Sequence, residues 1–131
     1  MILLVVFVFV VTIDIDIVVK RVSQPKQSRH QQSLGDKRKA DSYICEANFY
    51  KNLAPYLIEY KGLRIPRPYF VETEPAITIC MEKLNGFVRS VDKEETYAVL
   101  DWLAILHAAT WGNRADEAVV KHGLQPVGTY W

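Results

Sequence analysis

One lysine interrupts an apolar, strand-like segment near the start of the chain. From Ile13 onward, apolar residues alternate with the two-residue period of a β-strand. Lys20 falls within "IVVKRV" and shares its face of this strand with Val18 and Val22. A lone lysine in a strand is commonly an exposed edge residue, so its position alone does not indicate a site.

One glutamate occupies a comparable position in a helix-like segment. The sequence "YICEANFYKNLA" predicts a helix that is capped by Asp41 or Ser42 and ends near Pro55. Helical spacing places Glu46 in the middle of the apolar stripe of this helix. The stripe consists of Tyr43, Phe49, Tyr50 and Leu53.

A pairing of Lys20 with Glu46 explains both placements. An unpaired buried charge is costly, and opposite charges that meet across a strand–helix interface relieve that cost. The alternative is two unrelated side chains that reach water separately. A strand lysine held by a helix glutamate is the arrangement with which kinases bind the α- and β-phosphates of ATP. We therefore expect Lys20 to face a nucleotide cleft.

A second element of this cleft is the apolar strand in "ICMEKLNG", which runs into a turn. In the kinase arrangement, such a strand leads into the hinge between two lobes. Met81 would then line the back of the adenine pocket, and the backbone of Glu82 and Leu84 would hydrogen-bond the adenine edge. The alternative is an ordinary strand that ends in a turn.

The remaining segments predict a mixed α+β order. Residues 23–41 lack an apolar period and predict a loop. Two strands, "YFVETE" and "AITICMEKL", are expected around a turn at Glu74 and Pro75. Asp92 and Glu95 form a capping box for the helix "EETYAVLDWLAILHAATW". That helix is apolar nearly all round, as is usual for a helix buried on several sides, and a short helix is expected in the segment after it. The preceding segments are too small to cover all of these faces, so we expect Trp102, Ile105 or Trp111 to be left in water.

Composition restricts the classes of function. The chain has 131 residues, of which 50% are hydrophobic and 24% charged, which suits one globular domain. The net charge of +1 argues against a nucleic-acid-binding surface, and the basic cluster "GDKRKAD" is bracketed by acids. Cys45 and Cys80 lie outside any CxxC pattern, which argues against zinc and favours buried thiols in a reducing compartment.

The N-terminal run "MILLVVFVFVVTI" is apolar but does not have the pattern of a membrane span. It is shorter than the ~20 residues of a membrane helix and lacks the basic start and cleavage site of a secretory signal. Val, Ile and Phe favour strands. We interpret residues 1–12 as a strand or a non-native start and expect a cytoplasmic protein. The alternative is membrane association through residues 1–13.

The order of these segments resembles a known family. "IVVKRV", "SYICEANFYKNLAP", "RIPRPYFVE", "ICMEKL", "VLDWLAILHAATWG" and "GTYW" resemble the small-molecule kinases of the protein-kinase-like fold. The nearest branch is the ecdysteroid-kinase-like (CHK kinase-like) group, with aminoglycoside phosphotransferases and choline kinases as wider relatives. The resemblance implies an N-terminal lobe of antiparallel sheet and one helix over residues 13–84. Residues 85–131 would begin a helical C-terminal lobe with its first helix.

The resemblance also implies ATP-dependent transfer of the γ-phosphate to a hydroxyl of a small molecule, with Mg²⁺ as a further cofactor. Lys20 would bind phosphate, Glu46 would hold it, and Met81, Glu82 and Leu84 would surround the adenine. The helical lobe selects the acceptor in this fold, so the sequence does not name the substrate.

Several parts of the family pattern are missing. The catalytic pattern H-G-D-x-x-x-x-N and the later metal-binding I-D-x do not occur, and His122-Gly123 continues with Leu124. No glycine precedes Gly35, so no glycine-rich turn lies upstream of Lys20. We therefore expect a domain truncated before its catalytic loop and inactive alone. The alternative is a pseudokinase or interaction module that uses, or self-associates through, the exposed face of "WLAILHAATW".

Overall fold

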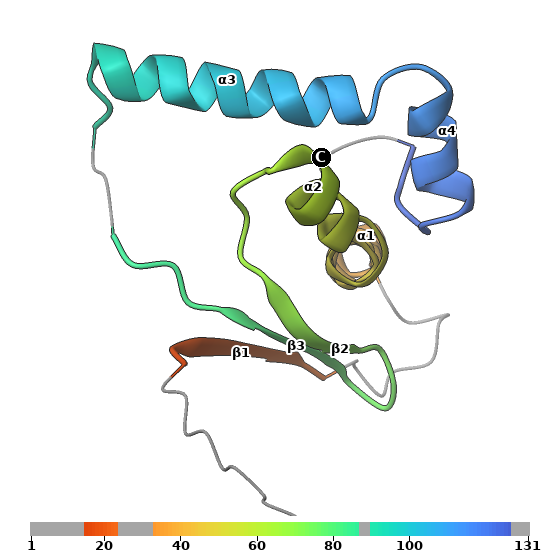
Figure 1. The fold of residues 1–131 in the computed structure, drawn as a ribbon. Coiled ribbons are helices and arrows are strands. Elements are labelled where there is room, and N and C mark those ends of the chain that lie inside the picture. The colour runs from red at the N-terminus through yellow and green to blue at the C-terminus, as the bar shows by residue number, and fades with distance from the viewer. Residues whose placement is uncertain (1–14, 24–32, 87–89, 127–131) are drawn as a thin grey trace, which may run out of the picture.

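The fold is α+β, as the sequence predicts, with a three-stranded antiparallel sheet and helices on one side of it (Figure 1). It is seen in a computed structural model that describes residues 15–23, 33–86 and 90–126. The predicted strand or anchor in residues 1–13 lies outside these ranges. The elements are β1 (Ile17–Val22), α1 (Leu34–Asn48), η2 (Phe49–Leu53), α2 (Ala54–Lys61), β2 (Pro68–Glu72), β3 (Ile77–Glu82), α3 (Lys93–Ala109) and α4 (Asn113–Val120).

The strand β3 lies at the centre of the sheet, between β1 and β2. Both pairings are antiparallel, and the predicted strands on either side of Glu74 and Pro75 are confirmed. The register places Lys20 opposite Ile79. Directly opposite residues share a face of the sheet, so Lys20 lies on the face that carries the buried side chains of β3. These side chains are Ile77, Ile79 and Met81.

The first helix begins earlier than predicted. Ser33 is its N-cap, because the Ser33 hydroxyl accepts from the Asp36 N–H and the Asp36 carboxylate accepts from the Ser33 N–H. The prediction of a cap at Asp41 or Ser42, and of a loop as far as residue 41, is therefore wrong. Residues 34–39 are polar or exposed, so no apolar period marks this part of the helix. A capping box supplies the start instead.

The elements α1, η2 and α2 follow one another without a break and form one helical path from Leu34 to Lys61. This path continues past Pro55, where the sequence predicts the end of the helix. A proline inside an α-helix lacks a donor and collides with the preceding turn. Here the π segment η2 comes first, and the Ala54 N–H donates to the Phe49 carbonyl five residues back. Pro55 consequently falls in the first turn of α2, where no helical donor is required. The predicted end at Pro55 is wrong because this change of helical register is not a feature of local composition.

Two apolar clusters join the elements. The first lies between α1 and the sheet, and the second joins η2 and α2 to α3. One helical path therefore contributes to both clusters, through its middle and through its C-terminal end. The buried members are Ala47, Ile77, Ile79 and Met81 in the first cluster, and Leu53, Leu57, Leu63 and Ala109 in the second.

The helix α3 has its predicted capping box, and the expected exposure of Ile105 and Trp111 is confirmed, whereas Trp102 is packed. Asp92 and Glu95 exchange the two expected hydrogen bonds. On one side, Trp102 packs in the second cluster and donates from Nε1 to the Arg64 carbonyl at 2.9 Å. Within the described residues, the remaining apolar faces of α3 are open to solvent. Exposed side chains here and just beyond include Tyr97, Val99, Leu100, Ile105 and Trp111.

None of the helices in the described ranges combines the length and the apolar character needed to cross a membrane. The membrane-anchor alternative depended on residues 1–13, so it remains a prediction outside the described part of the chain.

We expect Gly62→Ala to destabilise the protein by about 1–2 kcal/mol, since Gly62 ends α2 with a left-handed φ of 64°. A Cβ at this position would meet no atom within 4 Å, so the change isolates backbone strain. Gly35→Ala is the control, because Gly35 lies in the first turn of α1, and it should be neutral or stabilising by up to about 1 kcal/mol. Urea unfolding of both variants measures the difference, and equal effects would contradict the expectation.

Candidate functional site at Lys20 and Glu46

The predicted pairing of Lys20 with Glu46 is confirmed. Lys20 Nζ lies 2.5 Å from Glu46 Oε2, so β1 and α1 are joined by an ion pair between residues 26 apart. The two side chains are still 37% and 33% exposed. Full burial is therefore not the reason for the pairing, and none of the described charged or polar residues is buried. The pair lies at an accessible edge of the strand–helix interface.

The lysine has unused hydrogen-bonding capacity. An ammonium group carries three donors, and one is used by Glu46. In the described part of the chain, the Lys20 ammonium forms no other hydrogen bond. A partly exposed cation with free donors can donate to an anionic oxygen from solution. Such a group could bind a phosphate without breaking its bond to Glu46.

Two tyrosines of the helical path surround the pair. Lys20 Nζ lies 5.2 Å from the centre of the Tyr43 ring, which is within cation–π range. Burial raises the pKa of Tyr50, the negative charge of Glu46 raises it further, and Lys20 acts in the opposite direction. The sequence placed both tyrosines in the apolar stripe but did not connect them with Lys20. The available signal was their spacing of three and four residues from Glu46.

Met81 lies on the same sheet face as Lys20. It is opposite Val18 in the register and 9% exposed. Its side chain packs in the first apolar cluster with Ala47 and Ile79. The structure thus brings Met81 close to the interface that carries the ion pair, as part of the core beneath α1.

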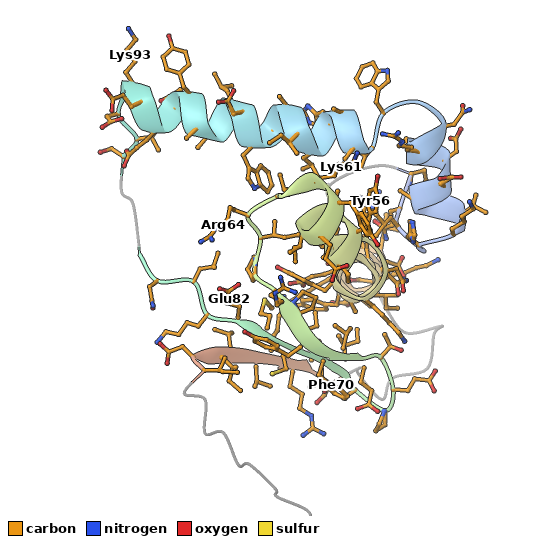
Figure 2. All side chains as sticks on the ribbon, viewed as in Figure 1. Tyr56, Lys61, Arg64, Phe70, Glu82 and Lys93 are labelled. Atoms are coloured by element: carbon orange, nitrogen blue, oxygen red, sulfur yellow. The ribbon has the colours of Figure 1, made fainter. Side chains whose placement is uncertain are left out.

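Glu82 and Leu84 lie where β3 leaves the sheet toward α3 (Figure 2). The Glu82 N–H donates to the Arg67 carbonyl at 2.8 Å, and the Glu82 carboxylate accepts from the Arg67 N–H at 3.2 Å. Lys83 donates from its N–H to the Asp16 carbonyl. These bonds fix the end of β3 on both sides. The Leu84 N–H has no backbone acceptor among the described residues, and Leu84 is half exposed.

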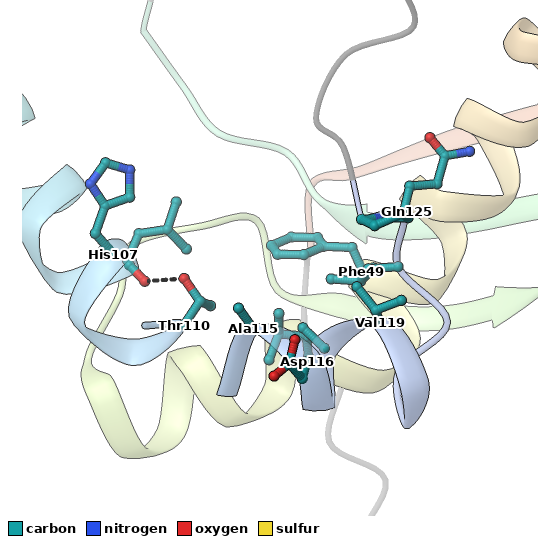
Figure 3. A pocket seen from close by; sticks show the side chains of 12 residues that line it. Phe49, His107, Thr110, Ala115, Asp116, Val119 and Gln125 are labelled. Atoms are coloured by element: carbon teal, nitrogen blue, oxygen red, sulfur yellow. Dashed lines mark hydrogen bonds between the residues drawn. The ribbon is translucent and has the colours of Figure 1, made fainter. Parts of the chain in front are cut away.

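A separate hollow of about 380 Å³ lies between η2, the end of α3 and α4 (Figure 3). Its wall is mainly apolar and includes Phe49 and Val119, with His107 and Asp116 as polar members. The Thr110 hydroxyl donates to the Leu106 carbonyl, so it is already satisfied within α3. The hollow contains none of the predicted site residues. The sequence did not predict it, because its walls combine η2 with α3 and α4, which come much later in the chain.

Metal ligands are scarce in the described part of the chain. Cys45 on α1 and Cys80 on β3 are free and half-buried, so their predicted burial is only partial. Over residues 15–23, 33–86 and 90–126, no group of three or more His, Cys, Asp or Glu side chains could hold a metal ion. Glu46, the carboxylate at the candidate site, is bound to Lys20. These residues therefore do not fit the Mg²⁺ that the family resemblance implies.

Comparisons of the chain with protein-family models, with curated proteins and with solved structures find no match. The family resemblance therefore remains a prediction.

A double-mutant cycle should detect coupling between Lys20 and Glu46. With Lys20→Met and Glu46→Gln, we expect a coupling free energy of about 0.5–1 kcal/mol, the upper part of the range for partly exposed pairs. The control cycle uses Glu117 and Lys121, an exposed ion pair within α4 and its C-cap, and should give a smaller coupling. Urea unfolding at low ionic strength measures both cycles. Zero coupling at Lys20 with a positive control would contradict the geometry.

Stability should decline at alkaline pH partly through Tyr50. Its pKa is raised in the folded state, so its contribution is complete below the ordinary tyrosine pKa of about 10 and is lost as the pH rises through the raised value. Tyr50→Phe should therefore retain more of its neutral-pH stability than the wild type above pH ~10. Urea unfolding from about pH 8 to 11 tests this, with exposed Tyr97→Phe as the control. Identical pH profiles for all three proteins would contradict it.

Proposed function

We propose that this chain is the nucleotide-binding part of an ATP-dependent small-molecule kinase of the protein-kinase-like fold, related to the ecdysteroid-kinase-like group. The observation that carries this proposal is the Lys20–Glu46 ion pair between β1 and α1. In kinases, a glutamate from the helix holds the strand lysine, and the lysine binds the α- and β-phosphates. The antiparallel sheet with one helical path across its inner face supports the same fold.

The chemistry at Lys20 suits a phosphate ligand. Its ammonium is a point charge with free donors, and the Tyr43 ring and Glu46 limit where it can lie. The Glu46 carboxylate offsets part of the positive charge, so one lysine alone should bind phosphate weakly. In the kinase arrangement, the Leu84 N–H would donate to the adenine edge.

Phosphate transfer by this chain alone is not expected. The sequence lacks H-G-D-x-x-x-x-N and a glycine-rich turn before Lys20, and phosphoryl transfer depends on positioning and charge neutralisation. His122 and Gly123 lie in the turn after α4, where their carbonyl oxygens accept hydrogen bonds from Asn52 and Asn48. This structural use supports the interpretation that they are not catalytic. In the family reaction, a hydroxyl group of a small molecule accepts the phosphate, and we expect such an acceptor only for the complete domain.

The purified chain should bind ATP weakly and transfer no phosphate. Lys20→Ala should weaken ATP binding about tenfold, equivalent to about 1.4 kcal/mol, and leave adenosine binding unchanged, because only ATP presents phosphates to Lys20. Lys93→Ala, at the exposed start of α3, is the charge-matched control, and His122→Ala should have no effect. Titration calorimetry measures binding, and radiolabelled ATP measures transfer.

Two results would count against the proposal. Equal loss of ATP and adenosine affinity in Lys20→Ala would show that Lys20 does not bind the phosphates. Absence of any ATP binding by the wild-type chain would remove the nucleotide function altogether.

A second candidate function is protein interaction without catalysis, and the exposed apolar faces of α3 favour it. Tyr97, Leu100 and Ile105 are each at least 40% exposed, and covering a large apolar side chain gains about 1.5–3 kcal/mol. We propose self-association through α3. The polar residues of α3 lie in its first turn, apart from Asp101 and His107, so most of its length is apolar.

Sedimentation analysis should show dimers or larger species of the wild-type chain. Leu100→Glu together with Ile105→Glu should shift the population toward monomer, since a buried unpaired carboxylate opposes association. Lys93→Glu, on the same helix but at a polar position, should shift it less. A monomeric wild-type chain at high micromolar concentration would exclude self-association.

A further inference from the structure

Two asparagines on the helical path bind the turn that follows α4. Asn48 Nδ2 donates to the Gly123 carbonyl at 2.9 Å, and Asn52 Nδ2 donates to the His122 carbonyl at 3.1 Å. The partners are 75 and 70 residues apart in sequence. Within the described ranges, these are the only hydrogen bonds between the α1–η2 path and residues 90–126. Figure 1 shows α4 close to this part of the helical path.

The turn is shaped for this contact. Gly123 has a left-handed φ of 68°, and a Cβ on it would lie 2.7 Å from Asn48 Nδ2. Glycine therefore permits the carbonyl to approach the amide. The turn is also fixed to its own helix, because the Leu124 N–H donates to the Ala118 carbonyl and Leu124 packs in the second apolar cluster.

The π segment helps to align the two amides. A π turn is closed by hydrogen bonds five residues back and is wider than an α turn. Side chains four residues apart across it therefore lie more nearly in one line along the helix. Asn48 comes directly before η2 and Asn52 lies within it, so the two amides can meet successive carbonyls of the turn.

We propose that Asn48 and Asn52 are positioning residues that couple the α3–α4 part of the chain to the ion pair at Lys20. Asn48 follows Glu46 by two residues in the same helix, so a shift at Asn48 moves the Glu46 carboxylate relative to Lys20. On α1, Ala47 is the one fully buried residue, and the partly buried Tyr43 packs against the same cluster on the sheet. A partly exposed ion pair also fixes its own geometry only weakly. The asparagine contacts supply the additional constraint.

The geometric effect is independent of any ligand, whereas its consequence for ATP rests on the proposed function. Asn48→Ala and Asn52→Ala remove the contact from the helix, and Gly123→Ala removes it from the turn. Asn113→Ala is the matched control, because Asn113 begins α4 and its side chain forms no hydrogen bond to the described residues. Thermal unfolding identifies the variants that remain folded.

The primary measurement is the nuclear Overhauser effect between the Lys20 ε-protons and the Glu46 γ-protons, without nucleotide. We expect this effect to weaken in Asn48→Ala and in Gly123→Ala, because the Lys20–Glu46 contact is then formed for a smaller share of the time, and to stay constant in Asn113→Ala. If Asn48→Ala does not fold, Asn52→Ala provides the same test farther from Glu46. An unchanged effect in the folded variants would show that the asparagines only fasten the turn, and would overturn the proposal.

ATP titration separates this inference from the proposed function. If the wild type binds ATP, Asn48→Ala should raise its Kd about threefold and leave the Kd for adenosine unchanged. If the wild type binds no ATP, the nucleotide function fails, while the proton measurement still decides whether the asparagines position Glu46. An unchanged Kd for ATP in a variant with a weakened Lys20–Glu46 contact would overturn the consequence for binding.

Discussion

The continuity of the helical path from Leu34 to Lys61 determines how the described parts of this chain are held together. An α-helix with Pro55 in its interior would bend or break, and the apolar residues on either side would then separate. The π segment η2 prevents this by placing Pro55 in the first turn of α2. Ala47 can consequently pack on the sheet while Leu57 packs against α3. The same path carries Glu46 to Lys20.

The Lys20–Glu46 ion pair determines where the Lys20 ammonium lies, but it contributes little to the stability of the fold. Both side chains retain about a third of their exposure, so water screens their attraction and the net contribution to folding is small. The same exposure leaves the Lys20 ammonium accessible to an anion. A fully buried pair would be dry and would have to be broken or opened before a phosphate could bind. The partial exposure of the pair therefore leaves the Lys20 ammonium accessible to the phosphate ligand that we propose.

Local sequence patterns predicted those strands and helix caps that depend on neighbouring residues in the chain. Alternation predicted the strands β1 and β3, and residue spacing predicted that Asp92 and Glu95 cap α3. The Lys20–Glu46 pair was predictable because each charge interrupts an apolar stripe. The start at Ser33 was missed because a cap, without apolar periodicity, defines it. The passage through Pro55 was missed because the π register depends on hydrogen bonds rather than on composition.

Contacts between segments that are distant in the chain could not be predicted from local sequence patterns. The amides of Asn48 and Asn52 bind carbonyls at least 70 residues away, and no short pattern pairs an asparagine with a backbone oxygen. For α3, apolar composition shows that cover is favourable but not which segment provides it. The structure places Met81 in the core beneath α1, while its predicted place at an adenine pocket stays a prediction. Whether the backbone of Glu82 and Leu84 meets adenine depends on a ligand, and stays a prediction.

The two proposed functions can coexist because they use different surfaces. The ion pair lies between β1 and α1, whereas α2 lies between the sheet and α3 (Figure 1). Trp102 faces that inner side of α3, and Tyr97, Leu100 and Ile105 are exposed on the remaining faces. A partner that covered these faces would reduce the apolar surface without occupying Lys20. The asparagine contacts then provide a physical route by which a change at α3 and α4 could reach Glu46, since α4 ends at the turn that Asn48 binds.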